Sequence, residues 1–171
     1  MVNQLIDSIE YEPDKGRLAL QTASYVLVRP ALLVEIQKAL ETHLPYEAAS
    51  ILSSAAQNDG VSLAGRLKDV FSYSPEQVLS SIAFMLAETG WGAASMEMFN
   101  SDNQEIVLKV LASPFADEYG PTANPVCFYL LGLFQGAAVA LFETDVDGQE
   151  VQCAARGDSA CRFVVTAARR P

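Results

Sequence analysis

The chain has 171 residues, half of them hydrophobic, and a formal net charge of −10 at pH 7. This length and composition predict a globular protein with one domain over residues 1–171 and a core of its own. The negative charge argues against binding to nucleic acid or to an anionic membrane surface, since both require a patch of Lys and Arg.

The N-terminus does not have the pattern of a secretory signal. Residues 1–17 lack a basic region followed by a long apolar core. We therefore expect a cytoplasmic protein, in a reducing compartment where free thiols or metal binding are favoured over disulfides.

Residues 16–44 predict short strands followed by a helix. The stretch 16–30 is rich in β-branched and aromatic residues toward its end, which predicts one or two strands that stop at Pro30. Residues 30–44 follow with proline at the first position, where a helix tolerates it. Their apolar residues recur at helical spacing: Leu32, Leu33, Ile36 and Leu40.

Two further helices are expected before residue 91. Residues 46–71 predict either one long helix or two helices separated at 58–60, where Asn, Asp and Gly follow one another. Residues 74–90 predict a helix that begins with Ser74 as N-cap and ends with Gly90 as C-cap.

Beyond residue 90 the sequence is typical of antiparallel strands. Residues 91–100 and 104–113 predict a β-hairpin, 115–125 a loop, and the C-terminal stretch a second hairpin that turns at Gly157 and Asp158. Helices and strands mixed in this order indicate an α+β fold, an antiparallel sheet packed against a layer of helices.

Residues 126–142 are almost entirely apolar. At 17 residues, with Gln135 near the middle, the segment is short for a membrane span and predicts a helix buried in a protein core. Gly132, Gly136 and Ala140 follow at four-residue spacing, which lets another backbone approach closely. That backbone could belong to the same chain or to a second subunit.

The chain has three cysteines, Cys127, Cys153 and Cys161, and Glu150 precedes the last two. The spacing alone leaves three alternatives open: buried thiols, a disulfide between Cys153 and Cys161, or structural zinc bound by three thiolates and a carboxylate. In a regular strand Glu150 and Cys153 would point to opposite faces. The zinc alternative therefore predicts an odd-length loop or a β-bulge in the last hairpin.

Two segments carry a family resemblance. NPVCFYLLGLFQGAAVALF (124–142) places a cysteine before a glycine-bearing helix, and EVQCAARGDSACRFVV (150–165) supplies Glu, Cys, Gly-Asp, Cys and Phe in series. GWGAASMEMF and LASPFA upstream are also similar. Over about residues 20–165 the chain resembles the 4-vinyl-reductase domain, also called the hydrocarbon-binding domain.

The resemblance implies a fold shared with Golgi transport subunits and haem-based nitric-oxide sensors. It also implies zinc, which the sensor domains of phenol- and xylene-responsive activators bind at the matching positions, here Cys127, Glu150, Cys153 and Cys161. Family members hold small apolar or aromatic molecules in an internal pocket. The candidate pocket residues, each of which could also be ordinary core, are Trp91, Phe99, Phe115, Tyr119, Phe128 and Phe134.

The expected function is that of a zinc-containing sensor or carrier of an apolar or aromatic ligand, in a homodimer with a separate signalling partner. Alternatives are a carrier of vinyl tetrapyrroles in (bacterio)chlorophyll synthesis and a tethering-type scaffold. No catalytic residue stands out and no GxGxxG or flavin motif is visible, so catalysis is not expected. Phenol sensors grip the hydroxyl with a histidine and a tryptophan. The single histidine here, His43, lies far from the matching segments, so the resemblance implies neither phenol specificity nor haem.

Overall fold

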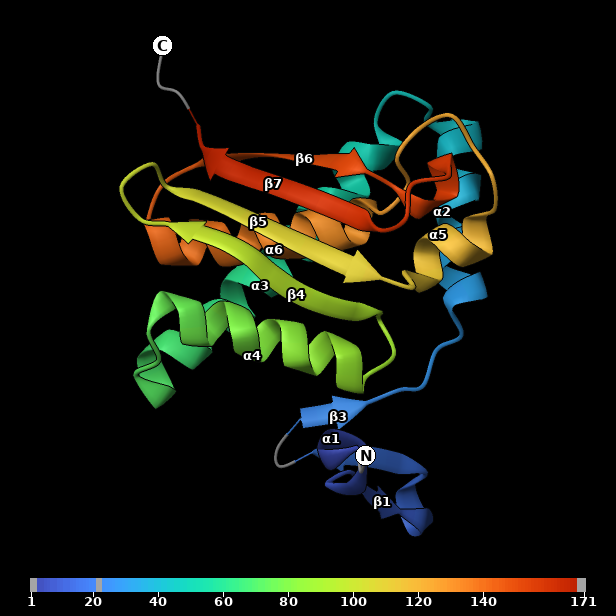
Figure 1. Ribbon diagram of the computed structural model, residues 1–171. Coiled ribbons are helices and arrows are strands. Elements are labelled where there is room, and N and C mark those ends of the chain that lie inside the picture. The colour runs from blue at the N-terminus through green and yellow to red at the C-terminus, as the bar shows by residue number, and fades with distance from the viewer. Residues whose placement is uncertain (1–2, 21–22, 169–171) are drawn as a thin grey trace.

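The computed structural model describes residues 3–20 and 23–168, and its main body is a four-stranded antiparallel sheet with helices packed on one face. Figure 1 shows α3, α4 and α6 beneath this sheet, and a small three-stranded sheet set apart near the N-terminus. The predicted α+β fold is confirmed.

The four-stranded sheet follows the order β4-β5-β7-β6, with every neighbouring pair antiparallel. Its strands are β4 (Ala93–Asn100), β5 (Glu105–Leu111), β6 (Val146–Gln152) and β7 (Cys161–Ala167). Alternate residues of the central strands are fully buried against the helices, including Ile106, Leu108 and Phe163. Both predicted hairpins are therefore present, and they pair through β5 and β7.

The small sheet consists of β1 (Glu10–Glu12), β2 (Arg17–Leu20) and β3 (Ala23–Tyr25), with a 3-10 turn, η1 (Pro13–Lys15), between the first two. The short helix α1 (Gln4–Asp7) ties it to the main body. The Asn3 side chain donates to the carbonyl of Glu88 at 2.7 Å, and the Leu5 N–H donates to the Glu88 carboxylate at 3.2 Å. The strand prediction for 16–30 is correct up to residue 25.

Five further helices follow: α2 (Pro30–His43), α3 (Ala48–Phe71), α4 (Pro75–Glu88), α5 (Pro114–Tyr119) and α6 (Phe128–Phe142). The helices predicted at 30–44, 74–90 and 126–142 are confirmed. The start of α4 has the predicted N-cap, because Ser74 and Gln77 form a reciprocal capping box. In the described part of the chain, no helix is both long enough and apolar enough to cross a membrane.

Two predictions about helices are wrong. The alternative break at 58–60 is absent and α3 is continuous, because Gly60 lies against the backbone of α6 at Leu133. The loop predicted at 115–125 begins as α5. Pro114 takes its first position, and the Ser113 hydroxyl caps it by accepting from the Ala116 N–H.

The glycines of α6 serve a contact within the chain. A Cβ at Gly132 would overlap the backbone of Ser53, and one at Gly136 would overlap that of Gln57. Since Ser53 and Gln57 belong to α3, the small-residue ridge lets α3 and α6 pack backbone to backbone. The structure therefore decides the open question about this ridge in favour of the intrachain contact.

The buried side of α2 is not the apolar side that predicted the helix. Val34 and Gln37 are buried, whereas Leu32 and Ile36 are about half exposed, at 55% and 47%. Gln37 is accommodated because its side-chain amide donates to the carbonyl of Val126 at 3.1 Å.

Candidate metal centre

Four side chains from distant parts of the chain meet at one end of the sheet. Cys127 is the N-cap residue of α6, Glu150 lies in β6, Cys153 precedes the short 3-10 turn η2 (Ala154–Arg156), and Cys161 begins β7. One ligand atom from each lies within 4.8 Å of the others, and all four residues are buried. The candidate ligand set is therefore assembled in space.

A β-bulge resolves the facing problem in the last hairpin. Glu150 pairs with Phe163, but the next pair is Gln152 with Arg162, so Val151 is the extra residue. Val151 is exposed while Glu150 and Cys153 are both buried. The irregularity that the zinc alternative predicted is present, and it turns both ligands to the same side.

The turn that follows fixes the backbone of Cys153. The Asp158 carboxylate accepts from the Cys153 N–H at 2.8 Å, and the N–H groups of Arg156 and Asp158 donate to the Cys153 carbonyl. Gly157 lies between them at φ 93°, in the left-handed region that glycine adopts without strain. The Gly-Asp pair thus has a defined role, which is to present Cys153 to the cluster.

The geometry of the cluster fits a tetrahedral ion. Zn–S bonds near 2.3 Å place two thiolates of a tetrahedral site about 3.8 Å apart, and the Sγ atoms of Cys127 and Cys161 lie 3.6 Å apart. This separation is far beyond a disulfide bond, and all three cysteines are free thiols.

The Glu150 carboxylate is only partly satisfied by the protein. Its Oε2 accepts from the Cys127 N–H at 2.9 Å. Its Oε1 is buried and has no hydrogen-bond partner in the described part of the chain. A buried polar atom without a partner costs roughly 1–3 kcal/mol, and a cation among the three sulfur atoms would remove that cost.

The electrostatics of the cluster point the same way. Desolvation raises the pKa of Glu150 to about 7. The hydrogen bond to Cys153 raises the pKa of the Cys127 thiol, while hydrogen bonds from Cys127 and Cys161 lower that of Cys153. Without a cation, the cluster therefore retains protons that a divalent ion would displace.

Two further groups contact the sulfur atoms. The fully buried Ser113 hydroxyl lies 3.3 Å from Cys127 Sγ, and the Ala154 N–H donates to Cys161 Sγ at 3.4 Å. Sequence spacing does not single out Ser113. The one signal for it is the similarity of LASPFA to the family.

The six candidate pocket aromatics occupy several environments. Trp91 and Phe115 contact each other and Tyr129, with ring centroids 5.3 to 6.3 Å apart. The other two rings in the core pair with aromatic neighbours outside the candidate set: Phe99 with Phe142 and Phe134 with Phe163.

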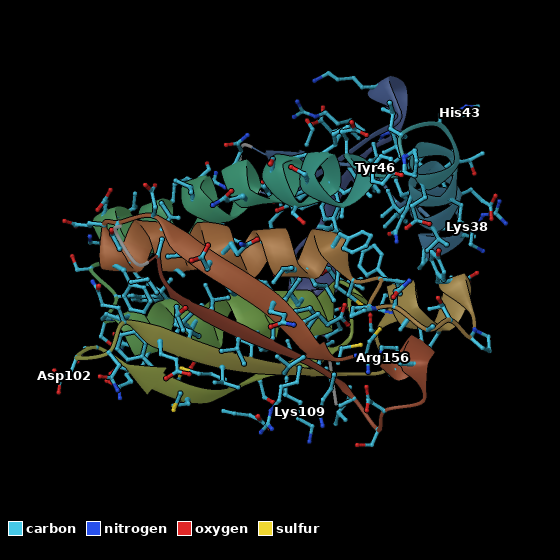
Figure 2. All side chains as sticks on the ribbon, turned by 90° about the horizontal axis from the view of Figure 1, so that it is seen from above. Lys38, His43, Tyr46, Asp102, Lys109 and Arg156 are labelled. Carbon is cyan, nitrogen blue, oxygen red and sulfur yellow. The ribbon has the colours of Figure 1, made fainter. Side chains whose placement is uncertain are left out.

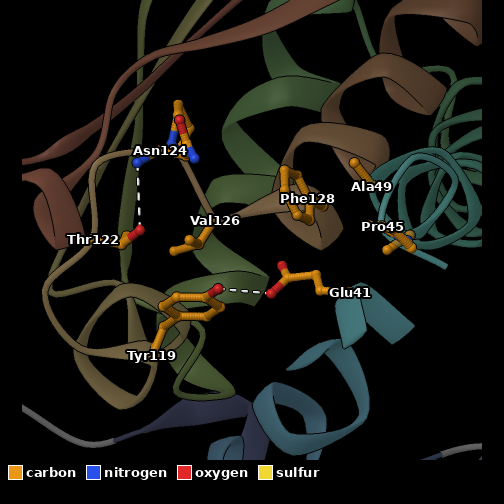
Figure 3. Close-up of a pocket in the computed structure, with 10 residues that line it drawn as sticks. Glu41, Pro45, Ala49, Tyr119, Thr122, Asn124, Val126 and Phe128 are labelled. Carbon is orange, nitrogen blue, oxygen red and sulfur yellow. Dashed lines mark hydrogen bonds between the residues drawn. The ribbon is translucent and has the colours of Figure 1, made fainter. Parts of the chain in front are cut away.

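The remaining two candidates, Tyr119 and Phe128, line a cavity of about 220 Å³ that none of the four candidate ligands lines (Figure 3). The prediction of a shared ligand pocket stays a prediction. His43 lies exposed in the last turn of α2, away from the cluster (Figure 2).

Comparison with known sequences places the cluster in a family motif. Residues 106–167 match the family model of the vinyl-4-reductase domain, and all four candidate ligands lie in this segment. The resemblance to the 4-vinyl-reductase family is thereby confirmed. An uncharacterized protein of Methanocaldococcus jannaschii is 37% identical over 60 residues, which are 35% of this chain and 33% of that relative. The match thus spans about a third of the curated relative.

Solved structures share the fold over most of the chain. The phenol-responsive sensory domain of the transcription activator PoxR, solved with phenol, has a TM-score of 0.80 at 20% identity. The match covers 95% of this chain and 86% of that domain.

Two more distant structures have the fold that the resemblance implied. A trafficking protein particle complex subunit 3 from Naegleria fowleri, covalently bound to palmitic acid, gives a TM-score of 0.55 at 17% identity, covering 82% of this chain and 95% of that one. An H-NOX protein from S. oneidensis gives 0.57 at 15% identity, covering 86% and 80%.

Proposed function

We propose that this protein is a small-molecule sensor or carrier domain that contains a structural zinc ion. The observation that carries the proposal is the buried meeting of Cys127, Glu150, Cys153 and Cys161 within 4.8 Å. Three thiolates and one carboxylate suit zinc, because soft sulfur ligands disfavour magnesium and calcium. Four protein ligands would close the coordination shell, as in structural zinc sites.

The ion would act by joining segments. Cys127 stands at the start of α6, while the other three ligands belong to the last hairpin. Zinc bound there would fasten the end of the sheet to the helix beneath it, and its binding energy would add to the stability of the fold.

The ligand that we propose is a small apolar or aromatic molecule. Supporting this are the match to the family model and the fold shared with the PoxR sensory domain, which is described as phenol-responsive. We further propose a cytoplasmic homodimer with a separate signalling partner.

Native mass spectrometry of the purified protein tests the metal. We expect one zinc ion per chain, lost in Cys153→Ser, because removing one thiolate opens the coordination shell. Arg156→Ala is the matched control, since Arg156 is exposed in the same hairpin turn. Less than half an equivalent of zinc in the wild-type protein, or full zinc in Cys153→Ser, would overturn this part of the proposal.

Binding is tested on the zinc-loaded protein with phenol and toluene as probes. Saturable binding of either, measured by calorimetry, would support an aromatic-ligand domain, and light scattering of the same sample reports the dimer. Copurifying pigment with tetrapyrrole absorbance would instead favour the tetrapyrrole carrier.

A further inference from the structure

A cavity of about 220 Å³ lies outside the metal centre, between α2, the start of α3 and the segment that leads from α5 into α6 (Figure 3). At roughly 30 Å³ for each water in the liquid, this is the space of about seven water molecules. The cavity is therefore large enough for a compact organic molecule.

Glu41 gives this cavity a negative charge. It is the only charged side chain among the described residues that line the cavity, so no Lys, Arg or His of the lining offsets it. Tyr119 also lines the cavity and donates its hydroxyl to Glu41 Oε2 at 2.6 Å. This bond raises the pKa of Tyr119 to about 12, so its ring stays neutral and the carboxylate keeps its charge.

The carboxylate is held in a fixed orientation. Gln37 donates to Glu41 Oε1 at 3.0 Å and also to the carbonyl of Val126. Gln37 is itself only 4% exposed. Because both donors are anchored, the carboxylate is positioned in advance and a ligand need not order it.

The other walls are aromatic or apolar. The rings of Tyr119 and Phe128 and the side chains of Pro45 and Val126 line the space. An aromatic face attracts a cation within about 6 Å. The Tyr119 ring already does so, since the Lys38 ammonium lies 5.0 Å from its centroid.

We propose that this cavity is a second binding site and that it takes a small organic cation, an ammonium group on a compact apolar body. The charge would lie beside Glu41, and the body would contact Phe128, Pro45 and Val126. An anion is disfavoured by the carboxylate, and a neutral apolar ligand would desolvate that carboxylate without pairing it. The site is separate from the proposed zinc and aromatic-ligand functions, which can fail while it stands.

The test uses choline and its neutral carbon isostere, 3,3-dimethyl-1-butanol, titrated into the full-length zinc-loaded protein by two-dimensional NMR. We expect choline to bind about tenfold more tightly than the isostere, with shifts at Tyr119 and Phe128. Glu41→Gln keeps an acceptor for Tyr119 but removes the charge. It should lose that tenfold preference for choline while binding the isostere as before.

Two further variants separate charge in the cavity from charge elsewhere and from folding. Glu35→Gln removes the same charge from an exposed side chain of the same helix, and should bind choline as the wild type does. Phe128→Leu keeps an apolar wall but removes the ring, so it should weaken choline severalfold and leave the isostere unchanged. Zinc content and an intact NMR spectrum establish that each variant is folded.

The proposal is overturned if choline and the isostere bind equally, or if Glu41→Gln binds choline as tightly as the wild type. It also fails if choline produces no saturable shift below about 10 mM, which is weaker than any useful charge recognition.

Discussion

Burial of the Glu150 carboxyl makes the metal-free protein sensitive to pH. Its pKa in the folded state is raised from 4.5 to about 7, chiefly by desolvation. A raised pKa favours the protonated folded form, so this contribution to stability is complete below about pH 4.5 and is lost as the pH rises through 7. The shift corresponds to roughly 3 kcal/mol.

We therefore expect chelated protein to lose roughly 2–3 kcal/mol of unfolding free energy between pH 5 and pH 8, measured by urea denaturation. Glu150→Gln, which does not titrate, serves as the control and should show a much flatter profile. Zinc should reverse the trend, because its ligands bind as anions and its affinity rises with pH. Equal pH profiles for the two chelated proteins would contradict this prediction.

Ser113 is expected to tune the metal centre through Cys127. Its hydroxyl lies 3.3 Å from Cys127 Sγ, and groups that hold metal ligands in place typically contribute 10- to 100-fold to affinity. Ser113→Ala should therefore lower zinc affinity about tenfold, measured by competition with a chromogenic chelator. Ser159→Ala, exposed in the neighbouring loop, is the control. An unchanged affinity would mean that Ser113 serves only to cap α5.

The residues of the metal centre show what sequence reasoning can and cannot supply. The cysteine spacing left thiols, a disulfide and zinc open, and the family resemblance selected the four ligands. Strand alternation alone would have separated Glu150 from Cys153, because a bulge at Val151 depends on pairing with β7. Sequence reasoning could state that a bulge was needed, but only the paired strands show that it occurs after Glu150.

At the scale of elements, the backbone contact between α3 and α6 predicts a strong contrast between two glycines. Gly132→Ala would force its Cβ into the Ser53 backbone, whereas a Cβ at Gly65 of α3 meets nothing within 4 Å. We expect Gly132→Ala to destabilise the fold by about 1–3 kcal/mol. Gly65→Ala should stabilise it by about 0.5–1 kcal/mol through helix propensity.

Urea unfolding of the two variants beside the wild type provides the measurement. Since both changes are Gly→Ala within a helix, the propensity gain is common to them and the difference reports the contact. A Gly132→Ala variant at least as stable as Gly65→Ala would show that α3 and α6 are not in backbone contact.

Most elements could be predicted because their signals are local. The capping box of α4 and the apolar run of α6 lie within a few residues of sequence. The errors arose where tertiary contacts decide. Gly60 resembles a helix break until α6 packs on it, and α2 buries Gln37 rather than Ile36 because the Val126 carbonyl accepts from the amide.

At the scale of the whole molecule, the proposed zinc ion would stabilise one end of the main sheet and leave the small sheet unaffected. The metal centre connects Ser113, the start of α6 and both strands of the last hairpin. The small sheet and its leading helix are joined to the main body at Glu88 of α4, distant in sequence from every ligand.

Hydrogen exchange read by mass spectrometry can test this division. Removal of zinc by a chelator should increase exchange in peptides covering 113–128 and 150–163, because the backbone bonds there position ligands or donate to them. Residues 10–20 should exchange at the same rate with and without metal. Arg156→Ala should respond to the chelator as the wild type does, while Cys153→Ser should exchange like chelated protein before any chelator is added. A uniform increase along the chain would instead mean that the ion stabilises the fold as one cooperative unit, and an unchanged pattern at 113–128 would separate α6 from the metal centre.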